Sequence, residues 1–314
     1  MRYMNPGFKD WFSVINDSSS LTETTDSTKT KTGIAFFNTK PYSNFLLFDF
    51  PANNEIWIKF DFFAETYFFY FGEPYNSNYY SLWNGFSLNL NTTDTTVMKY
   101  IKGVSSQVGR LENSITRLKI NGINSILLHL KWADSTNGFM DLQINDYFFD
   151  RIEDTNLTPL RDKAAISFQS SSNRNSVSNL IISDETVSIK EQLVPLQISG
   201  VDTDMTFDSE TGIYTASEVN QSLLASVNVA DLISDFGGSS KATGVAVVGN
   251  PAYRTAEGLA TFTALTKKNN IVTEHSAANI PTDSNSVVAN SFKIDSDTTI
   301  TDLQNMQIGF KVGE

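Results

Sequence analysis

Apolar and polar side chains alternate with a period of two along much of the first two thirds of the chain. In residues 56–62 every even position is Ile or Phe, whereas Lys59 and Asp61 occupy two of the odd positions. Residues 125–132 and 139–144 repeat this pattern, again with apolar side chains at the even positions. Successive side chains of a strand point to opposite faces, so the alternation predicts half-buried antiparallel strands.

Residues that favour tight turns separate these runs. Asn137-Gly138 suits a turn with positive φ, so the last two runs are predicted to form a hairpin closed by residues 133–138. Asn145-Asp146 suits a second turn, which would return the chain into residues 147–149. Many short strands joined by such turns favour a sandwich or barrel over alternating strands and helices.

The last third of the chain continues the β pattern with more polar residues. Its expected strands cover residues 212–216, 223–229, 243–248, 259–266, 271–274, 286–294 and 306–312. Two short helices are also predicted. Residues 230–236 precede Gly237-Gly238, which can stop a helix because glycine adopts the left-handed conformation at little cost. Residues 300–304 follow Thr298 and Thr299, either of which can cap a helix N-terminus.

Composition changes near residue 198. Of the 38 Phe, Tyr and Trp residues, 31 precede residue 199. Residues 199–314 carry 6 basic and 14 acidic side chains (−8), whereas residues 1–198 carry 17 and 21 (−4). We therefore expect an all-β chain with two domains, a β-sandwich in residues 1–198 and a smaller β-rich domain in residues 199–314. Within residues 1–32, the polar tract 17–32 is expected to be a long loop, with an exposed threonine-rich strand as the alternative.

Composition also excludes several classes of protein. The chain has no cysteine and only two histidines, so disulfide frameworks, thiolate metal sites and multi-histidine zinc sites are excluded. A net charge of −12 and a pI near 4.6 argue against nucleic acid as a partner. No apolar run approaches the ~20 residues that cross a bilayer. The N-terminus lacks the apolar segment of a secretory signal, so we expect a soluble protein made in the cytoplasm without an export signal.

Catalytic residues are not evident in the sequence. Glycoside hydrolysis requires two carboxylates about 5–10 Å apart. The nearest acid pairs, Asp202 with Asp204 and Asp295 with Asp297, fall where turns are predicted. No serine lies in a Gly-x-Ser-x-Gly motif, and His129 is expected to be a hydrogen-bonded histidine within a strand. We therefore expect no catalytic residue, no metal and no cofactor, and hence a protein that is not an enzyme.

A tract rich in aromatic and amide side chains is a candidate for ligand binding. It contains Tyr75, Asn78, Tyr79, Tyr80 and Trp83. Sugars stack their C–H faces on aromatic rings while amides and carboxylates bond their hydroxyl groups. The alternative is that these rings pack over a sheet edge or against a neighbouring subunit.

The loop of the predicted hairpin is a second candidate. Asp134 and Asn137 offer hard oxygen atoms that could bond a ligand or hold calcium. The loop lacks the ligand spacing and the terminal glutamate of an EF-hand, and a plain hairpin loop explains it about as well. We count both residues as candidate ligand-binding residues without assigning a metal.

Three segments resemble a known family. Residues 125–132 and 138–146, two runs joined by a turn, resemble paired strands of a concanavalin A-like (laminin-G-like) jelly roll. Residues 177–191 are similar to the closing strand of that domain in tail proteins of phages and prophages. Residues 243–253 look like modules of phage tail-associated proteins. The resemblance implies a jelly-roll sandwich followed by a C-terminal β domain for attachment or oligomerisation.

The resemblance also implies a function. It suggests a non-enzymatic structural component of a phage or phage-like tail particle, located in the virion, that binds host-surface glycan. Its expected partners are other virion proteins and copies of itself, most plausibly in a trimer, with no nucleic acid and no membrane insertion. Two alternatives stay open: a purely architectural tail, baseplate or head-fibre subunit without ligand, and a glycan hydrolase with an unrecognised acid pair.

Overall fold

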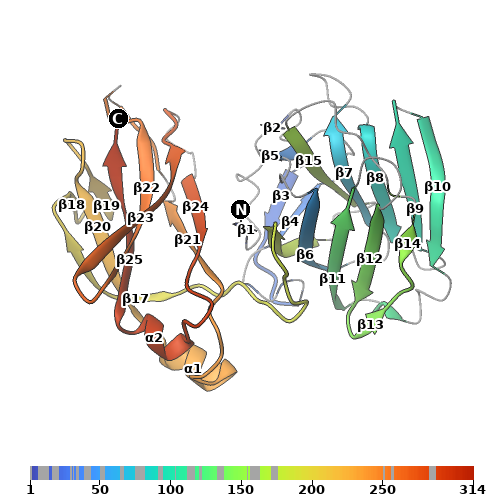
Figure 1. The fold of residues 1–314 in the computed structure, drawn as a ribbon. Coiled ribbons are helices and arrows are strands. Elements are labelled where there is room, and N and C mark those ends of the chain that lie inside the picture. Colours follow the sequence, from blue (N-terminus) through green and yellow to red (C-terminus); the bar gives the residue numbers. More distant parts are fainter. Residues whose placement is uncertain are drawn as a thin grey trace. The chain divides into compact units, whose positions relative to one another are not determined.

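The computed structural model of the 314-residue chain separates into two compact units, Tyr3–Val194 and Pro195–Glu314. The structure describes residues 2–5, 14–15, 21–28, 30, 32, 35–38, 44–49, 54–63, 67–74, 82–90, 95–102, 104–111, 117–119, 122–132, 138–153, 155, 163–170, 176–249, 252–255, 258–282 and 288–314. Figure 1 shows the strands that dominate both units.

Two antiparallel sheets face each other in the N-terminal unit (Figure 1). The first, called the β6 sheet, has the order β13 (Tyr147–Phe148), β12 (Phe139–Ile144), β11 (Ile123–Lys131), β6 (Glu55–Phe63), β16 (Ser176–Ser183), β4 (Ala35–Asn38) and β3 (Leu21–Thr24), with β1 (Arg2–Asn5) beside β16 and β14 (Ile152–Glu153) beside β12. The second, called the β7 sheet, has the order β10 (Val104–Leu111), β9 (Thr95–Ile101), β8 (Leu82–Leu90), β7 (Tyr67–Pro74), β15 (Lys163–Ser170), β5 (Asn44–Asp49) and β2 (Val14–Ile15).

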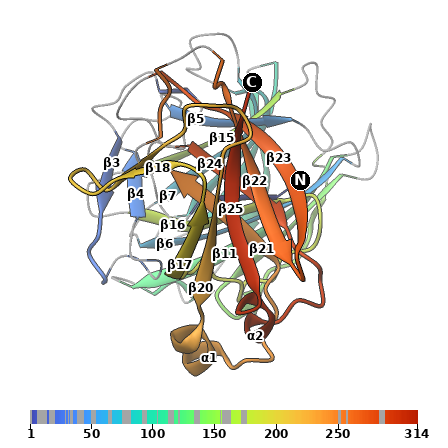
Figure 2. The same cartoon turned by 90° about the vertical axis from the view of Figure 1, so that its left-hand side faces the viewer.

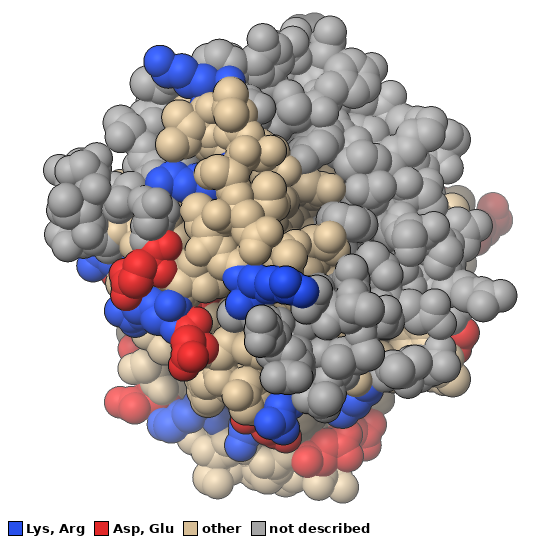
Figure 3. Space-filling view, turned by 90° about the vertical axis from the view of Figure 1, so that its right-hand side faces the viewer, with Lys and Arg blue, Asp and Glu red and all other residues tan. Residues whose placement is uncertain are grey.

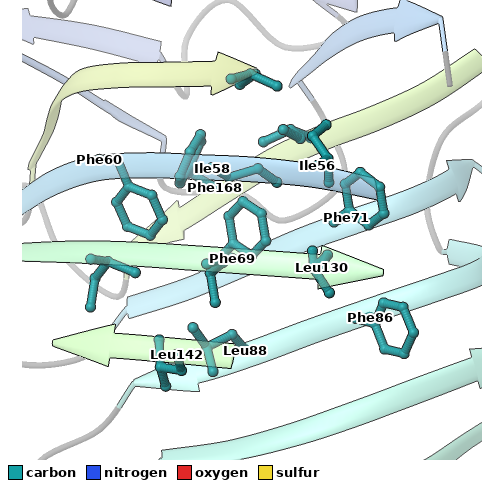
Figure 4. Close-up of a cluster of buried hydrophobic side chains, with 14 of the residues drawn as sticks. Ile56, Ile58, Phe60, Phe69, Phe71, Phe86, Leu88, Leu130, Leu142 and Phe168 are labelled. Atoms are coloured by element: carbon teal, nitrogen blue, oxygen red, sulfur yellow. The ribbon is translucent and has the colours of Figure 1, made fainter. Parts of the chain in front are cut away.

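Large apolar side chains fill the space between these sheets. Phe60 of β6 stacks on Phe69 of β7, with ring centroids 5.6 Å apart, and meets Phe168 of β15 edge-on at 5.1 Å. Figure 4 shows these rings among neighbouring Ile and Leu side chains of both sheets. The even positions of residues 56–62 point into this core, as the alternation predicted. The fold class is confirmed: the N-terminal unit is a jelly-roll β-sandwich of the concanavalin A-like kind.

The predicted hairpin and the turn at Asn145-Asp146 are confirmed, whereas the turn predicted at Asn137-Gly138 includes residue 137, which lies outside the described residues. Strands β11 and β12 pair with Leu128 opposite Leu142, and Asn145 has the positive φ of 53° expected at the next turn. The expectation of a loop in the tract 17–32 is wrong for Leu21–Thr24. These residues form β3, which pairs with β4, because an edge strand needs backbone partners on only one side and can leave its threonines exposed.

The C-terminal unit is also β-rich and carries two short helices. Its main sheet has the order β17 (Gln197–Thr203), β20 (Ser222–Asn228), β25 (Met306–Gly313), β22 (Thr261–Lys268) and β23 (Ile271–Asn279), and Figure 2 shows β25 between β20 and β22. Two hairpins, β18 (Thr206–Asp208) with β19 (Ile213–Thr215) and β21 (Gly244–Gly249) with β24 (Val288–Lys293), complete the unit.

The helices lie where the sequence predicted them. Helix α1 (Ala230–Phe236) ends at Gly237, whose φ is 82°. Helix α2 (Ile300–Leu303) begins at Thr299, whose side chain accepts a hydrogen bond from the Asp302 amide. Neither helix is long or apolar enough to cross a membrane, and the described residues contain no other that is. Asp202 was expected in a turn but lies in β17, a strand that the sequence pattern did not reveal because both of its faces are exposed.

Candidate functional site

The predicted ligand-binding residues fall in two connections of the N-terminal sandwich. Tyr75, Asn78, Tyr79 and Tyr80 belong to the β7–β8 connection, and Asp134 and Asn137 belong to the β11–β12 connection; all six lie outside the described residues. The backbone of Trp83 belongs to β8, and its side chain also lies outside the described part.

Both connections start from the same end of the sandwich. The Phe71 ring, three residues before the end of β7, packs on the Trp132 ring, which directly follows β11, with centroids 5.5 Å apart. In Figure 1 the arrowheads of β7 and β11 accordingly point to the same side. We call this side the Trp132 end. The sequence could not bring the two candidate tracts together, because 50 residues separate Trp83 from Asp134 and the tracts connect strands of different sheets.

A buried carboxylate lies at the base of the β7–β8 connection. Glu73 is fully buried and accepts a 2.7 Å hydrogen bond from Nδ2 of Asn84, its partner on β8. Oδ1 of Asn84 in turn accepts a 3.2 Å bond from the backbone N–H of Lys102, at the β9–β10 turn. A buried polar side chain is tolerated only when its hydrogen bonds are satisfied. These contacts satisfy Glu73 and also link β7, β8 and the end of β9 where the aromatic tract begins.

A second polar cluster lies near the Trp132 end on the outer face of the β6 sheet. His129 stacks on Trp57, its partner on β6, with centroids 4.2 Å apart and planes 9° apart. Its Nε2 lies 2.6 Å from Oε1 of Glu55, and its Nδ1 lies 3.3 Å from Oδ2 of Asp141 on β12.

Arg151 completes this cluster. Its guanidinium donates two hydrogen bonds to the Asp141 carboxylate, at 2.7 and 2.8 Å, and lies 3.6 Å from the centroid of the Phe139 ring. The sequence analysis singled out His129 but missed Trp57, Asp141 and Arg151. A hairpin closed by residues 133–138 would place Leu142 opposite His129, whereas the observed register pairs Lys131 with Phe139 and so places Asp141 opposite His129.

This cluster contains charged and aromatic side chains, but its two carboxylates do not face each other across a space that a sugar could enter. The imidazole of His129 fills the space between Glu55 and Asp141, so the two carboxylates do not flank a gap for a glycosidic bond. Among the described residues, no three or more acidic or histidine side chains gather in a way that could hold a metal ion. On the face in Figure 3, the coloured basic and acidic side chains lie interspersed.

Comparisons with known proteins give similarities of fold. No family model matches the chain, and no curated protein matches it. Among solved structures, an endo-β-1,4-glucuronan lyase from the fungus Trichoderma reesei is 10% identical with a TM-score of 0.40, covering 57% of this chain and 94% of the lyase. The metal-free carbohydrate recognition domain of Emp46p is 12% identical (TM-score 0.37; 59% and 97% covered). The alginate lyase Aly36B, in complex with an alginate tetrasaccharide, is 13% identical (TM-score 0.36; 60% and 98% covered).

At such identities and TM-scores, these structures carry no argument about what this chain binds. They do correct one expectation. The expectation that the protein is not an enzyme does not stand, since lyases are among the structures of similar fold. That conclusion rested on the missing acid pair of a hydrolase and the missing serine motif, and a lyase does not cleave its substrate by hydrolysis. The lack of those motifs therefore does not exclude enzymatic activity.

Proposed function

We propose that the N-terminal sandwich binds a glycan at the Trp132 end. The observation that carries this proposal is the contact between the Phe71 and Trp132 rings. Because of this contact, the connection with the aromatic tract and the connection with Asp134 and Asn137 both begin at the same end of the sandwich. Rings that stack on sugar faces and oxygen groups that bond hydroxyls would then lie within one ligand's reach. The bond between Glu73 and Asn84 supports the proposal, since it anchors the first of these connections in the core.

A glycan array probed with the full chain tests this proposal. Tyr79→Ala with Trp83→Ala should abolish the binding seen with the unchanged protein. Phe148→Ala is the matched control: its ring is 71% exposed on β13, at the opposite end of the sandwich (Figure 1). Unchanged binding by the double variant would reject the site. Release of products from a bound polysaccharide would show that the same end also cleaves its ligand.

We also propose, from the sequence resemblance alone, that the protein is a component of a phage or phage-like tail particle. In this proposal residues 1–198 contact the host surface, and residues 199–314 attach to the particle or oligomerise as a trimer. Light scattering of the full chain in solution tests the assembly, and a monomer at every concentration would contradict it. In the purely architectural alternative, Tyr75, Tyr79 and Trp83 would be buried between subunits and would bind no glycan.

A further inference from the structure

Three polar side chains are completely buried on the outer face of the β6 sheet. Lys59 and Asp61, both on β6, form an ion pair with Nζ 3.0 Å from Oδ1, and their side chains are 1% and 0% exposed. Asn179 of β16, also 0% exposed, donates from Nδ2 to Oδ2 of Asp61 at 2.8 Å. The amine and the carboxamide therefore contact the two oxygen atoms of one carboxylate.

The register of β6 and β16 places Asn179 between its two partners. Asp61 pairs with Ser178 and Lys59 pairs with Ile181, so a bulge inserts an extra residue between them. Asn179 lies in this bulge with a φ of 55°, a conformation that asparagine tolerates better than most residues. In a regular strand, the side chain that follows Ser178 would point to the opposite face of the sheet. The bulge instead directs the carboxamide of Asn179 toward Asp61.

The carbonyl group of Asn179 is also polarised. Its Oδ1 accepts a 2.8 Å hydrogen bond from the backbone N–H of Leu193. A second bond, at 3.3 Å, runs from Nδ2 to the carbonyl oxygen of Glu191. These contacts hold the segment that follows β16 against the sheet. They also leave the carboxamide in a fixed orientation, with an N–H donor at the oxygen that would become negative if an amine attacked Cγ.

We propose that Lys59 and Asn179 form an intramolecular amide crosslink, with Asp61 transferring the protons. Asp61 takes one proton from the Lys59 ammonium, and the neutral amine attacks Cγ of Asn179. The Leu193 N–H stabilises the tetrahedral adduct at Oδ1. Asp61 then donates this first proton to Nδ2 and accepts a second proton from the attacking nitrogen. The Cγ–Nδ2 bond breaks, and the departing ammonia takes the second proton from Asp61 and leaves as ammonium. One Nζ–Cγ bond thus replaces one Cγ–Nδ2 bond, and the Asp61 carboxylate is restored.

Burial favours this reaction because reacting groups held in one orientation behave as if present at very high concentration. Reaction requires that the lysine side chain brings Nζ to about 3 Å from Cγ of Asn179. The crosslink would join β6 to β16 covalently. It does not depend on any ligand of the Trp132 end.

The intact mass of the purified full chain tests the crosslink. We expect a mass about 17 Da below that of the sequence, the mass of one ammonia, and a branched tryptic peptide joining the Lys59 and Asn179 segments. Full sequence mass after prolonged incubation of the folded protein would overturn the proposal. This measurement needs no variant, so a folding defect cannot obscure it.

Two variants separate the crosslink from other losses of ammonia. Lys59→Arg keeps a cation beside Asp61 but removes the attacking amine, so it should show the full mass. A cyclic imide formed by Asn179 with its own backbone would lose ammonia in this variant too, and that result would also overturn the proposal. Asp61→Asn keeps both reacting groups and removes the proton carrier, and we expect the uncrosslinked mass.

Discussion

Glu73 is a buried residue whose hydrogen bonds link neighbouring strands at the base of the β7–β8 connection. Its buried carboxylate holds Asn84, and Asn84 holds the Lys102 amide. Glu73→Ala leaves the Asn84 amide without this partner, so we expect the N-terminal unit to lose about 1–3 kcal/mol of stability. Urea unfolding followed by tryptophan fluorescence measures this, because all four tryptophans precede residue 195.

Two further variants make this prediction specific. Glu73→Gln keeps the shape and a hydrogen-bond acceptor, so it should cost less than the alanine variant. Glu153→Ala removes an exposed carboxylate of β14 and should change the unfolding midpoint little. Equal effects of Glu73→Ala and Glu153→Ala would show that the buried bond does not stabilise the unit.

His275 gives the C-terminal unit a pH dependence. Its ring stacks on Phe292 with centroids 3.7 Å apart, its Nε2 lies 2.9 Å from Oγ1 of Thr266, and burial lowers its pKa below the usual value of 6.5. As the pH falls through about 6.5, the unfolded chain binds a proton before the folded unit does, so stability declines. Above that pH both states are neutral at this residue and the effect vanishes.

Calorimetry at about pH 7.5 and about pH 5.5 checks this direction. The unchanged protein should lose melting temperature in the C-terminal transition over this interval. His275→Gln, which keeps a hydrogen-bonding group near Thr266 but does not titrate, should lose less. The same loss in both proteins would assign the pH dependence to other groups.

Among the elements, the pairing of β25 with β20 requires glycine at position 309. A Cβ atom added at Gly309 would lie 1.8 Å from the carbonyl oxygen of Leu223 on β20, so the two strands approach too closely for any other residue. Gly309→Ala must push β20 and β25 apart, and we expect the C-terminal unit to lose about 1–3 kcal/mol. Gly200→Ala on β17 is the matched control, since an added Cβ there meets nothing within 4 Å. Equal melting temperatures of the two variants would contradict this account.

The elements also show where sequence reasoning succeeds. Residues 125–132 and 139–144 could be predicted as neighbouring strands because only six residues separate them in the sequence. Helix α2 could be placed because Thr299 signals its start. Strand β17 was missed, and β3 was foreseen only as the alternative to a loop, because edge strands with exposed faces need no alternation of apolar residues.

At the scale of the whole molecule, each unit has hydrophobic clusters of its own. We therefore expect two unfolding transitions, since units with separate cores need not unfold together. Tryptophan fluorescence should follow only the N-terminal transition, whereas calorimetry should record both. A single calorimetric transition that coincides with the fluorescence change would show that the units unfold as one.

The sequence by itself determined the all-β class, the main hairpin and both short helices. These features follow from side-chain periodicity and turn residues, which are properties of short segments. Only the tertiary structure decided that β7 and β11 end on the same side, that Trp57 and Asp141 flank His129, and that Asn179 meets Asp61. Asp61 and Asn179 are 118 positions apart, and periodicity tells which face of a strand is buried but not which strand lies beside it.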